Sequence, residues 1–341
     1  MSWRMPAEGA RQERLWLAWP TGGYTLGDTA EEAEEARRTW AAVANAAAGF
    51  EPVSVVVHPR DVDLVARYLD GSIEVFVREI DDAWIRDSGP TFVVDDEVPG
   101  SLGAVTWTFN GWGGQEWASW QHDSTLGPAV ADWAGAERID SPLVNEGGGI
   151  HVDGAGTVLV TETVQRDPGR NPGITRKAVE AELARTLGTT TTIWLPRGLT
   201  RDSSTFGTRG HVDIVATIAS PGRLLLHDQR DQAHPDFAVS AELRAALSEA
   251  RDAAGRLFEI VDLPAPEVLR DEEGFVDYSY VNHVLVNDGV IACAFDDPRD
   301  ADALAILRDA YPGRTVTAVD ARPLFARGGG IHCITQQQPA V

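Results

Sequence analysis

The hydrophobic positions of this chain fall into short apolar runs, which predict buried strands, and longer Ala- and Glu-rich stretches, which predict helices. The run Leu15–Trp19 ends at Pro20, and the long helical pattern after it can be capped by Asp28 or Thr29. In order, the N-terminal part predicts a strand over 15–19, a helix up to about Ala48, a strand over 53–57, a short helix over 61–69 and a strand over 73–77.

From Asp87 onward, one order of elements recurs: a polar residue leads into a β-hairpin, which gives way to a helix and then one more strand. The hairpin turns are rich in Asp, Asn, Gly and Pro, the residues that tight turns favour. The predicted hairpins lie at 150–160 and around turns at 220–222 and 287–289, the following helices at about 175–187, from Ser240 to about 253 and at 300–311, and the closing strands at 192–196, 257–263 and 315–319.

The polar residue that opens each unit returns at intervals of about 60 residues. These residues are Asp87, Glu146, His211, Asn282 and Cys333. The unit that begins at Cys333 has no room to finish, and the segment 15–48 would supply its missing strand and helix if the two chain ends met. Five ββαβ units closed in this way predict a ring without free sheet edges and with the polar residues at its centre. The alternative is an ordinary α/β sheet with hairpins scattered by chance.

The domain organisation follows from the absence of a dividing segment in the sequence. No low-complexity linker or block of charge interrupts the chain, so residues 1–341 are predicted to form a single catalytic domain. Two stretches, 166–173 and 198–210, read as long surface loops and are candidates for a lid over the site.

The charge balance narrows the choice of partners. The 341 residues include 52 Asp and Glu against 29 Lys and Arg, a net charge of -23, so neither nucleic acid nor an anionic membrane surface is an expected partner. A cationic small molecule is a better match for this negative charge than either of them. No segment approaches the ~20 apolar residues of a membrane span, and residues 1–10 lack the apolar core of a signal peptide, so a cytoplasmic protein is expected. The sequence leaves open whether the chain forms a homodimer.

Cys333 is the leading candidate for chemistry because it follows the glycines Gly328–Gly330 on what reads as a short strand. Glycines there predict close backbone approach rather than core filling. Since the thiolate is the reactive form and a free thiol has a pKa near ~8.5, an activating partner is needed. Alternation along a strand predicts that His332 faces away, so the base must come from elsewhere. Cys293, in an apolar run, is predicted to be buried and inert.

His211 and Asp213 are the strongest partners for Cys333, since residues two apart on a strand share a face. Glu146, which precedes three glycines of its own, is predicted to orient the imidazole. Asp87 is a second carboxylate at a strand entry, where it is either a ligand or a turn cap. Two carboxylates beside a thiol and an imidazole suit a planar guanidinium, whose N–H groups match carboxylates in pairs.

Metal and nucleotide sites are weaker alternatives. A zinc site could be built from His151, Asp153, His211, Asp213, His332 and Cys333. The chain lacks Cys-x-x-Cys and His-Glu-x-x-His spacings, however, and adjacent ligands on one strand cannot both reach one metal. It also lacks the Gly-rich phosphate-binding loops of nucleotide sites. No metal and no cofactor is therefore expected.

Motifs spread over nearly the whole chain carry a resemblance. They are Met5–Glu8, Leu15–Pro20, Asp82–Pro90, Phe109–Gly114, Glu146–Gly148, Gly210–Asp213 and Gly329–Pro339. In this order they resemble the agmatine deiminase family, which is related to bacterial peptidylarginine deiminases. The resemblance implies a five-bladed α/β propeller of ββαβ units with pseudo five-fold symmetry, in agreement with the predicted ring.

The resemblance also implies a role for each candidate residue. Cys333 matches the family nucleophile and His211 its general acid and base. Asp87 and Asp213 match the carboxylates that bind the guanidinium, and Glu146 matches the acid that orients the histidine. The implied reaction is hydrolytic deimination of a small guanidino compound through a covalent Cys thiouronium intermediate, without a cofactor. For agmatine the products would be N-carbamoylputrescine and ammonia.

Some positions depart from the family's pattern and bear on the substrate. Thr21–Tyr24 stands where an Asn-Trp-Arg stretch is common, and His283 where an aromatic residue is common. Trp84 and Trp112 either line the alkyl chain of the substrate or belong to the core. The alternatives to agmatine deimination are therefore deimination of free or peptidyl arginine or another guanidine, amidino transfer to an amine, and guanidine binding without catalysis.

Overall fold

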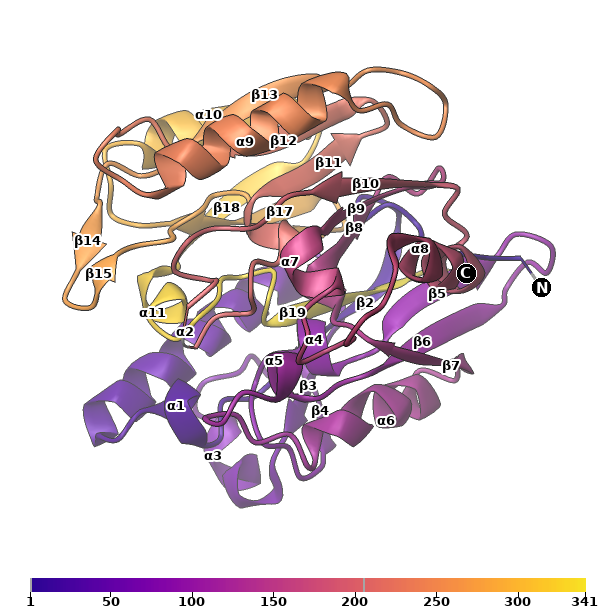
Figure 1. Cartoon of the computed structure of the whole chain (residues 1–341). Helices are drawn as coiled ribbons and strands as arrows, with labels where there is room; N and C mark the ends of the chain where they lie inside the picture. The colour runs from indigo at the N-terminus through magenta and orange to yellow at the C-terminus, as the bar shows by residue number, and fades with distance from the viewer. Residues whose placement is uncertain (1, 205) are drawn as a thin grey trace.

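The fold is built from small sheets, most of which repeat one strand order (Figure 1). The computed structural model describes residues 2–204 and 206–341. Five of the sheets share one internal order, in which two antiparallel neighbours are followed by a third strand parallel to the second. Helical segments connect the second and third strands, because parallel neighbours need a crossover connection. The observed fold is mixed α/β, as predicted.

The sheets and the helices that precede their third strands have these bounds. The first sheet has β1 (Trp3–Arg4), β5 (Thr91–Asp95), β6 (Leu102–Thr108), α6 (Leu126–Trp133) and β7 (Glu137–Val144). The second has β8 (Ile150–Val152), β9 (Thr157–Thr161), α7 (Glu162–Gln165), α8 (Arg176–Leu187) and β10 (Thr191–Leu195). The third has β11 (Ala216–Ser220), β12 (Arg223–Asp228), α9 (Asp236–Glu249) and β13 (Glu259–Pro264). The fourth has β16 (Val284–Val286), β17 (Gly289–Ala294), α10 (Asp300–Ala310) and β18 (Thr315–Asp320).

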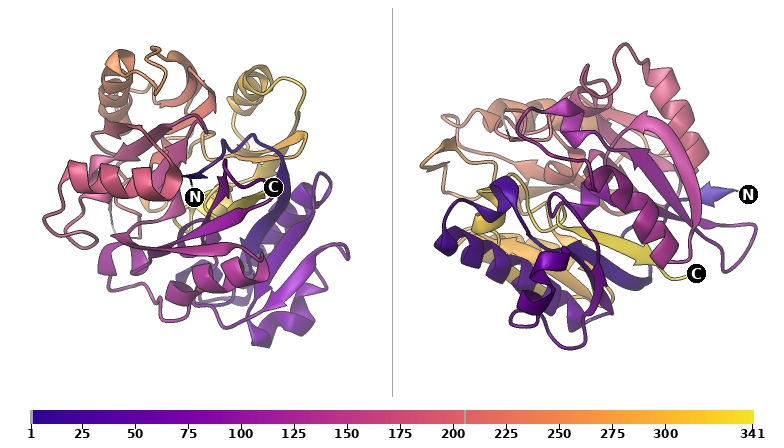
Figure 2. Two further views of the ribbon diagram at one scale, coloured as in Figure 1. Left: turned by 90° about the vertical axis from the view of Figure 1, so that its right-hand side faces the viewer. Right: turned by 90° about the horizontal axis from the view of Figure 1, so that it is seen from below.

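The fifth sheet joins the two ends of the chain. It contains β19 (Thr335–Pro339), β2 (Gln12–Ala18), β3 (Val53–Val57) and β4 (Glu74–Val77), with α2 (Ala30–Ala48) between β2 and β3. β19 pairs antiparallel with β2, with Thr335 opposite Leu17, and β2 runs parallel to β3. The prediction that the segment 15–48 completes the last unit is confirmed, and Figure 2 shows both termini on one side of the molecule.

Short elements fill the connections between the sheets. The short helices are α1 (Gly23–Leu26), α3 (Val62–Val65), α4 (Ile85–Ser88), α5 (Gly111–Gly114) and α11 (Arg322–Phe325). The single 3-10 turns are η1 (Pro59–Asp61), η2 (Asp123–Thr125), η3 (Gly147–Gly149) and η4 (Val212–Ile214). A small hairpin is formed by β14 (Arg270–Asp271) and β15 (Gly274–Phe275).

The helix starts show where local sequence chemistry decides and where it does not. Thr29 caps α2 as predicted: its side chain accepts from the Glu32 N–H, and the Glu32 side chain accepts from the Thr29 N–H. The predicted start of α9 at Ser240 is wrong, because the helix begins at Asp236 after Pro235. The Ser240 hydroxyl instead accepts from the Gln229 N–H at 3.0 Å.

The packing places the starts of the units in the interior. In Figure 1, α6 and α9 lie at opposite outer edges of the molecule, whereas α4 and β19 lie near its middle. Every residue of β3 is buried, and one apolar cluster joins this strand to Trp16, Trp19 and Trp40. Buried aromatic side chains of this size contribute strongly to folding. The polar residues that open the units, Asp87, Glu146, His211, Asn282 and Cys333, are buried as well.

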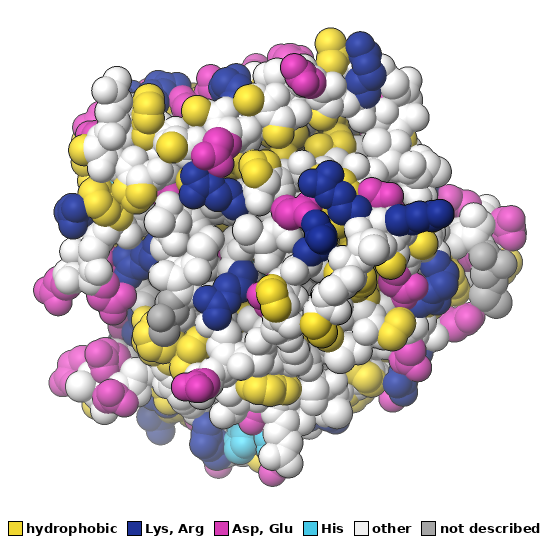
Figure 3. Space-filling model, viewed as in Figure 1, with side chains coloured by type: hydrophobic (Ala, Val, Ile, Leu, Met, Phe, Trp, Pro, Cys, Tyr) yellow, Lys and Arg dark blue, Asp and Glu magenta, His cyan; other side chains and the backbone are white. Residues whose placement is uncertain are grey.

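The surface carries both signs of charge. On the face in Figure 3, acidic side chains lie mostly toward the edges, and several Lys and Arg groups lie nearer the middle. The net charge of -23 is therefore not gathered into one patch on this face. Among the described residues, no helix is both long enough and apolar enough to cross a membrane.

Candidate active site

Cys333 lies in a turn between α11 and β19, not on the predicted strand, because β19 begins only at Thr335. The glycines before it leave space for close neighbours. A Cβ atom on Gly329 would lie 3.2 Å from Cys333 Sγ, and one on Gly330 would lie 2.4 Å from Asn282 Oδ1. The predicted close approach at these glycines is confirmed, and the groups that approach belong to the protein itself.

The Cys333 thiol is buried among polar groups. The Asn282 Nδ2–H donates to Sγ at 3.3 Å, and the thiol lies 3.7 Å from Asp213 Oδ2. Burial, and after it the negative charges of Asp213 and Asp87, raise the pKa of the thiol well above its ordinary value. In the protein without substrate, the Cys333 sulfur therefore carries its proton.

Cys293 is buried as well but has a different environment. Its thiol donates to the Asn282 carbonyl at 3.1 Å, and burial raises its pKa to about 12. The residues before it in β17, 289–292, are all buried. The predicted burial of this residue is confirmed, and its inertness stays a prediction.

His211 is the N-cap residue of η4 rather than a strand residue, so the predicted strand geometry is wrong here. Its backbone N–H donates to Asp202 Oδ2 at 2.9 Å, which fixes the turn. The ring Nε2 lies 3.2 Å from Glu146 Oε2, and Nδ1 lies 3.8 Å from Asp87 Oδ1. Burial alone would lower the pKa of the imidazole, but Asp87 and Glu146 outweigh it and raise the pKa to about 9. The ring is therefore an imidazolium at neutral pH.

Glu146 is fully buried and is held by Arg170, which the sequence did not single out. The Arg170 Nε–H donates to the two carboxylate oxygens at 2.8 and 3.0 Å, and its Nη2–H donates to the Thr208 carbonyl at 2.7 Å. Burial would raise the pKa of Glu146, but Arg170 and His211 lower it overall. An ionised carboxylate fixed in this way is what the predicted orienting role requires.

Asp87, His211 and Asp213 converge on Gly148. A Cβ atom on Gly148 would lie 2.4 Å from His211 Nδ1 and 3.0 Å from both Asp213 Oδ2 and Asp87 Oδ1. Asp87, on α4, accepts from the Gly148 N–H at 3.2 Å and from the Trp112 Nε1–H at 2.8 Å. Burial, opposed only in part by His211, raises the pKa of Asp87 to about 6. Side chains from two distant motifs thus meet around a glycine of a third, as predicted.

Asp213 is held by His332, which the sequence predicted to face away. His332 Nδ1 lies 2.7 Å from Asp213 Oδ2, and Nε2 lies 2.8 Å from Glu8 Oε1. The alternation argument fails because residues 331–334 form a turn. Burial opposes the charge of His332, but the two carboxylates raise its pKa overall. The ring therefore bridges the two acids. Glu8 lies in one of the recognised motifs, although no role was predicted for it.

The residues of the zinc alternative do not share a centre. His151 Nε2 lies 2.9 Å from the Thr217 hydroxyl, His211 faces Glu146, and both ring nitrogens of His332 face carboxylates. Over residues 2–204 and 206–341, no group of three His, Cys, Asp or Glu side chains is placed to hold a metal ion.

A narrow cavity of about 20 Å³ lies beside Cys333 and Asp87. Trp84 and Trp112 both line it and are both buried, so each belongs to the pocket wall and to the core. The wall is completed by Trp117, Phe206, Gly207, Thr208, Arg327 and Gly328. Phe206, Gly207 and Thr208 belong to the stretch 198–210, a candidate for a lid, and its action as a lid stays a prediction.

Comparison with known proteins decides the family. The sequence profile of the Porphyromonas-type peptidyl-arginine deiminases matches residues 4–339. The chain belongs to this family. A Streptomyces coelicolor protein, whose name assigns agmatine deiminase activity provisionally, is 55% identical over 340 residues and is matched over 99% of each chain. The agmatine deiminase of Stutzerimonas stutzeri is 40% identical over 360 residues, which cover 98% of this chain and 95% of its own.

A solved structure supports the same family. The agmatine deiminase of Enterococcus faecalis is 31% identical, covers 99% of this chain and 96% of its own, and superposes with a TM-score of 0.92. The resemblance inferred from the motifs is thus confirmed. One departure from the family's pattern is not part of the cavity lining: His283 is buried, with Nδ1 2.9 Å from the Tyr280 carbonyl and Nε2 2.8 Å from the Tyr311 hydroxyl.

Proposed function

We propose that this member of the family hydrolyses the guanidinium group of agmatine, giving N-carbamoylputrescine and ammonia. The convergence of a thiol, an imidazolium and two carboxylates on one buried point carries the proposal. The choice of substrate is supported by the relatives named as agmatine deiminases.

The two carboxylates receive the planar cation. Asp213 Oδ1 is buried and accepts no hydrogen bond from any residue that the structure describes. Asp87 Oδ1 accepts only a long bond of 3.2 Å from Gly148. Guanidinium N–H groups satisfy such acceptors well, because charge-assisted pairs with carboxylates are short and strong. The cation is thereby held beside Cys333 with its central carbon open to the sulfur.

Arrival of the cation changes the ionisation of the thiol. Asp213 and Asp87 help to keep the Cys333 thiol protonated, and a guanidinium between them cancels their negative field. The thiol pKa then falls, and the proton leaves to solvent. The thiolate forms a bond to the guanidinium carbon and gives a neutral tetrahedral adduct.

His211 then moves the remaining protons. Its imidazolium donates a proton to one amino group of the adduct, ammonia leaves, and a cationic thiouronium remains on Cys333. The neutral imidazole next takes a proton from water, which attacks the same carbon. Collapse of the second adduct breaks the carbon–sulfur bond, releases the ureido product and its hydroxyl proton, and restores the thiolate. Glu146 keeps the ring in position throughout, since it contacts Nε2.

The cavity wall favours a substrate without an α-carboxylate. Among the described residues that line the cavity, Arg327 is the one cationic side chain. Its guanidinium is already bonded to the carbonyls of Thr25, Glu32 and Pro323 and to the Glu35 carboxylate. Free arginine would bring a carboxylate that finds no unpaired cation there, whereas agmatine brings none.

Ammonia release from a panel of guanidino compounds tests the function. With agmatine we expect ammonia and N-carbamoylputrescine in equal amounts, with kcat/KM at least about 100-fold higher than for arginine or a peptide ending in arginine. Cys333→Ala and His211→Ala should each abolish turnover, and Cys293→Ala should not. Equal turnover of arginine would overturn the substrate assignment. A guanidino product without ammonia would indicate amidino transfer.

We propose further that the five sheets are the blades of one α/β propeller and that the chain is a single catalytic domain. The shared strand order of the sheets and the β19–β2 pairing support both statements. A reducing compartment such as the cytoplasm would keep the reactive thiol unoxidised, which supports a cytoplasmic location. Small-angle scattering with chromatography coupled to light scattering would test the shape and would decide between a monomer and a homodimer.

A further inference from the structure

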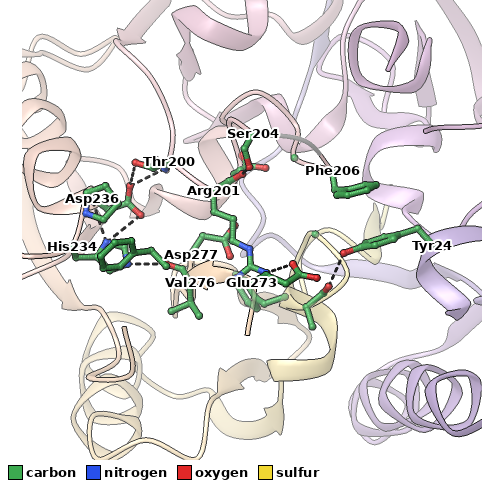
Figure 4. A pocket seen from close by; sticks show the side chains of 17 residues that line it. Tyr24, Thr200, Arg201, Ser204, Phe206, His234, Asp236, Glu273, Val276 and Asp277 are labelled. Atoms are coloured by element: carbon green, nitrogen blue, oxygen red, sulfur yellow. Dashed lines mark hydrogen bonds and ion pairs between the residues drawn. The ribbon is translucent and has the colours of Figure 1, made fainter. Parts of the chain in front are cut away.

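A second cavity, of about 310 Å³, adjoins the catalytic one and shares Phe206, Gly207 and Gly328 with it (Figure 4). Its walls come from segments far apart in the sequence: Tyr24 of α1, loop residues within 200–204 and 206–207, the start of α9 and the residues at and after β15. Phe206 and Tyr24 stack with ring centroids 4.5 Å apart at one side of it. The cavity is therefore a built feature next to the reacting centre.

The charged groups in this wall are mostly paired. Asp202 accepts from Thr208 and from the His211 N–H, and Asp236 accepts from the Thr200 N–H and hydroxyl. Arg201 donates to Asp271 and to Glu273, both at 2.6 Å. His234 donates from Nε2 to the Val276 carbonyl and accepts from the Asp236 N–H at Nδ1, so both ring nitrogens already have hydrogen-bond partners.

Asp277 is different from the other acids. Asp277 is only 5% exposed, yet its Oδ1 has no hydrogen-bond partner in the part of the chain that the structure describes. Burial, and after it the charge of Asp202, raise the pKa of Asp277 to about 7. A buried carboxylate without a partner costs free energy, and a cation placed on it would recover that cost. In Figure 4 it lies between His234 and the Arg201–Glu273 pair.

The charges and the apolar side chains of the lining indicate which kind of ligand the cavity would bind. The lining holds four carboxylates, from Asp202, Asp236, Glu273 and Asp277, against one guanidinium, from Arg201. Phe206, Phe275 and Val276 add apolar surface to the same lining. We propose that this cavity binds a primary alkylammonium group, with the nitrogen on Asp277 and the methylene stem against Phe206 and Phe275.

The ammonium can come from two sources. It is either the far end of the substrate whose guanidinium lies at Cys333, which rests on the proposed function, or a separate amine such as a diamine formed downstream of the ureido product. Both sources present the same chemistry to Asp277. They differ in whether occupancy of this cavity competes with substrate.

Calorimetric titration with butylamine, which carries one ammonium and no reactive guanidine, tests the site without requiring turnover. We expect saturable binding to the wild-type chain, at least tenfold weaker binding to Asp277→Asn, and binding within about fivefold of wild type for Asp277→Glu. Asp277→Asn should fold normally, because it removes an unpaired buried charge; its thermal midpoint checks this. The matched control is Asp309→Asn, which removes an exposed carboxylate paired with Arg223. This variant should bind butylamine as the wild type does.

Steady-state kinetics with agmatine and with butylguanidine, which lacks the ammonium, separates the sources. If the ammonium is the substrate's, Asp277→Asn raises KM for agmatine about tenfold, leaves KM for butylguanidine unchanged, and butylamine competes with agmatine. If it is a separate amine, agmatine KM is unchanged and butylamine does not compete. Absence of saturable butylamine binding to the wild type, or equal binding to wild type and Asp277→Asn, overturns the proposal. Neither result depends on agmatine being the substrate.

Discussion

Ionisation of single residues sets the pH range of the proposed reaction. Asp87 must be negative to hold the guanidinium, and burial raises its pKa to about 6. His211 must be protonated to release ammonia, and Asp87 and Glu146 raise its pKa to about 9 against the effect of burial. The free protein therefore needs Asp87 deprotonated and His211 protonated, and this state is populated between pH values of about 6 and about 9.

We accordingly expect kcat/KM for agmatine to rise as the pH passes about 6 and to fall as it passes about 9. Initial rates of ammonia release across this range measure the profile. Asp309→Asn should leave both limbs in place. A profile without the alkaline fall would contradict the assignment of His211 as the acid.

The glycine at the convergence point is a second test at this scale. Gly148→Ala places a Cβ atom 2.4 Å from His211 Nδ1, so the imidazole must move away from Asp87. We expect kcat to fall by about 100-fold or more, since small misplacements of reacting groups cost this much. Gly71→Ala, where a Cβ meets nothing within 4 Å, is the matched control and should leave kcat unchanged. Near-normal turnover by Gly148→Ala would contradict the geometry.

His332 links stability to pH. Its pKa is raised in the folded chain by Glu8 and Asp213, although burial opposes this. A raised pKa gives stability that is fully present below the unfolded value of about 6.5 and is lost as the pH rises through the folded value. His332→Gln should lower the free energy of unfolding by about 1–3 kcal/mol near pH 6. Urea unfolding should show this difference shrinking at alkaline pH, and a pH-independent difference would argue for packing alone.

The sequence predicted the polar groups that meet at the candidate site better than the groups that hold them in place. Cys333, His211, Asp87, Asp213 and Glu146 could be found because glycines, motifs and periodic spacing mark their positions. Arg170, Glu8 and the bridging part played by His332 could not, because each depends on an approach between distant segments. Arg170 sits in a loop that looked exposed, and its side chain is nevertheless completely buried.

Elements were predicted most accurately where local chemistry decides them. Hairpin turns and the cap of α2 depend on a few adjacent residues, and both were found. The regions around Cys333 and His211 were predicted as strands and are turns. Glycines next to both residues permit conformations that an alternating pattern cannot reveal, and tertiary contacts then select the turn.

The cap of α2 gives a prediction for an element far from the chemistry. Thr29→Ala removes the acceptor for the Glu32 N–H and one half of the capping box. We expect the free energy of unfolding to fall by about 1 kcal/mol, with kcat unchanged. Urea unfolding measures the change. Thr315→Ala, at an exposed position that begins β18, should alter stability less, and an equal loss would show that the cap is not the cause.

For the whole molecule, the pairing of β19 with β2 joins the chain ends into one sheet. The contact includes a hydrogen bond from the Trp16 Nε1–H to Gln338 Oε1 at 2.9 Å, between buried side chains. Deletion of residues 335–341 leaves β2 with an unpaired edge and removes the acceptor of the Trp16 Nε1–H. We expect loss of at least about 3 kcal/mol of stability and a tendency to aggregate. Thermal unfolding and light scattering measure both, and a soluble deletion variant with unchanged midpoint would contradict this.

The position of Cys333 in the strand-closing turn has a consequence for biosynthesis. The proposed nucleophile is followed directly by β19, the strand that pairs with β2 from the other end of the sequence. While residues 335–339 are still inside the exit tunnel of the ribosome, β19 cannot reach β2. The turn that holds Cys333 is therefore completed only after this segment has left the tunnel, so a transcript truncated before residue 335 yields a product without a reactive centre.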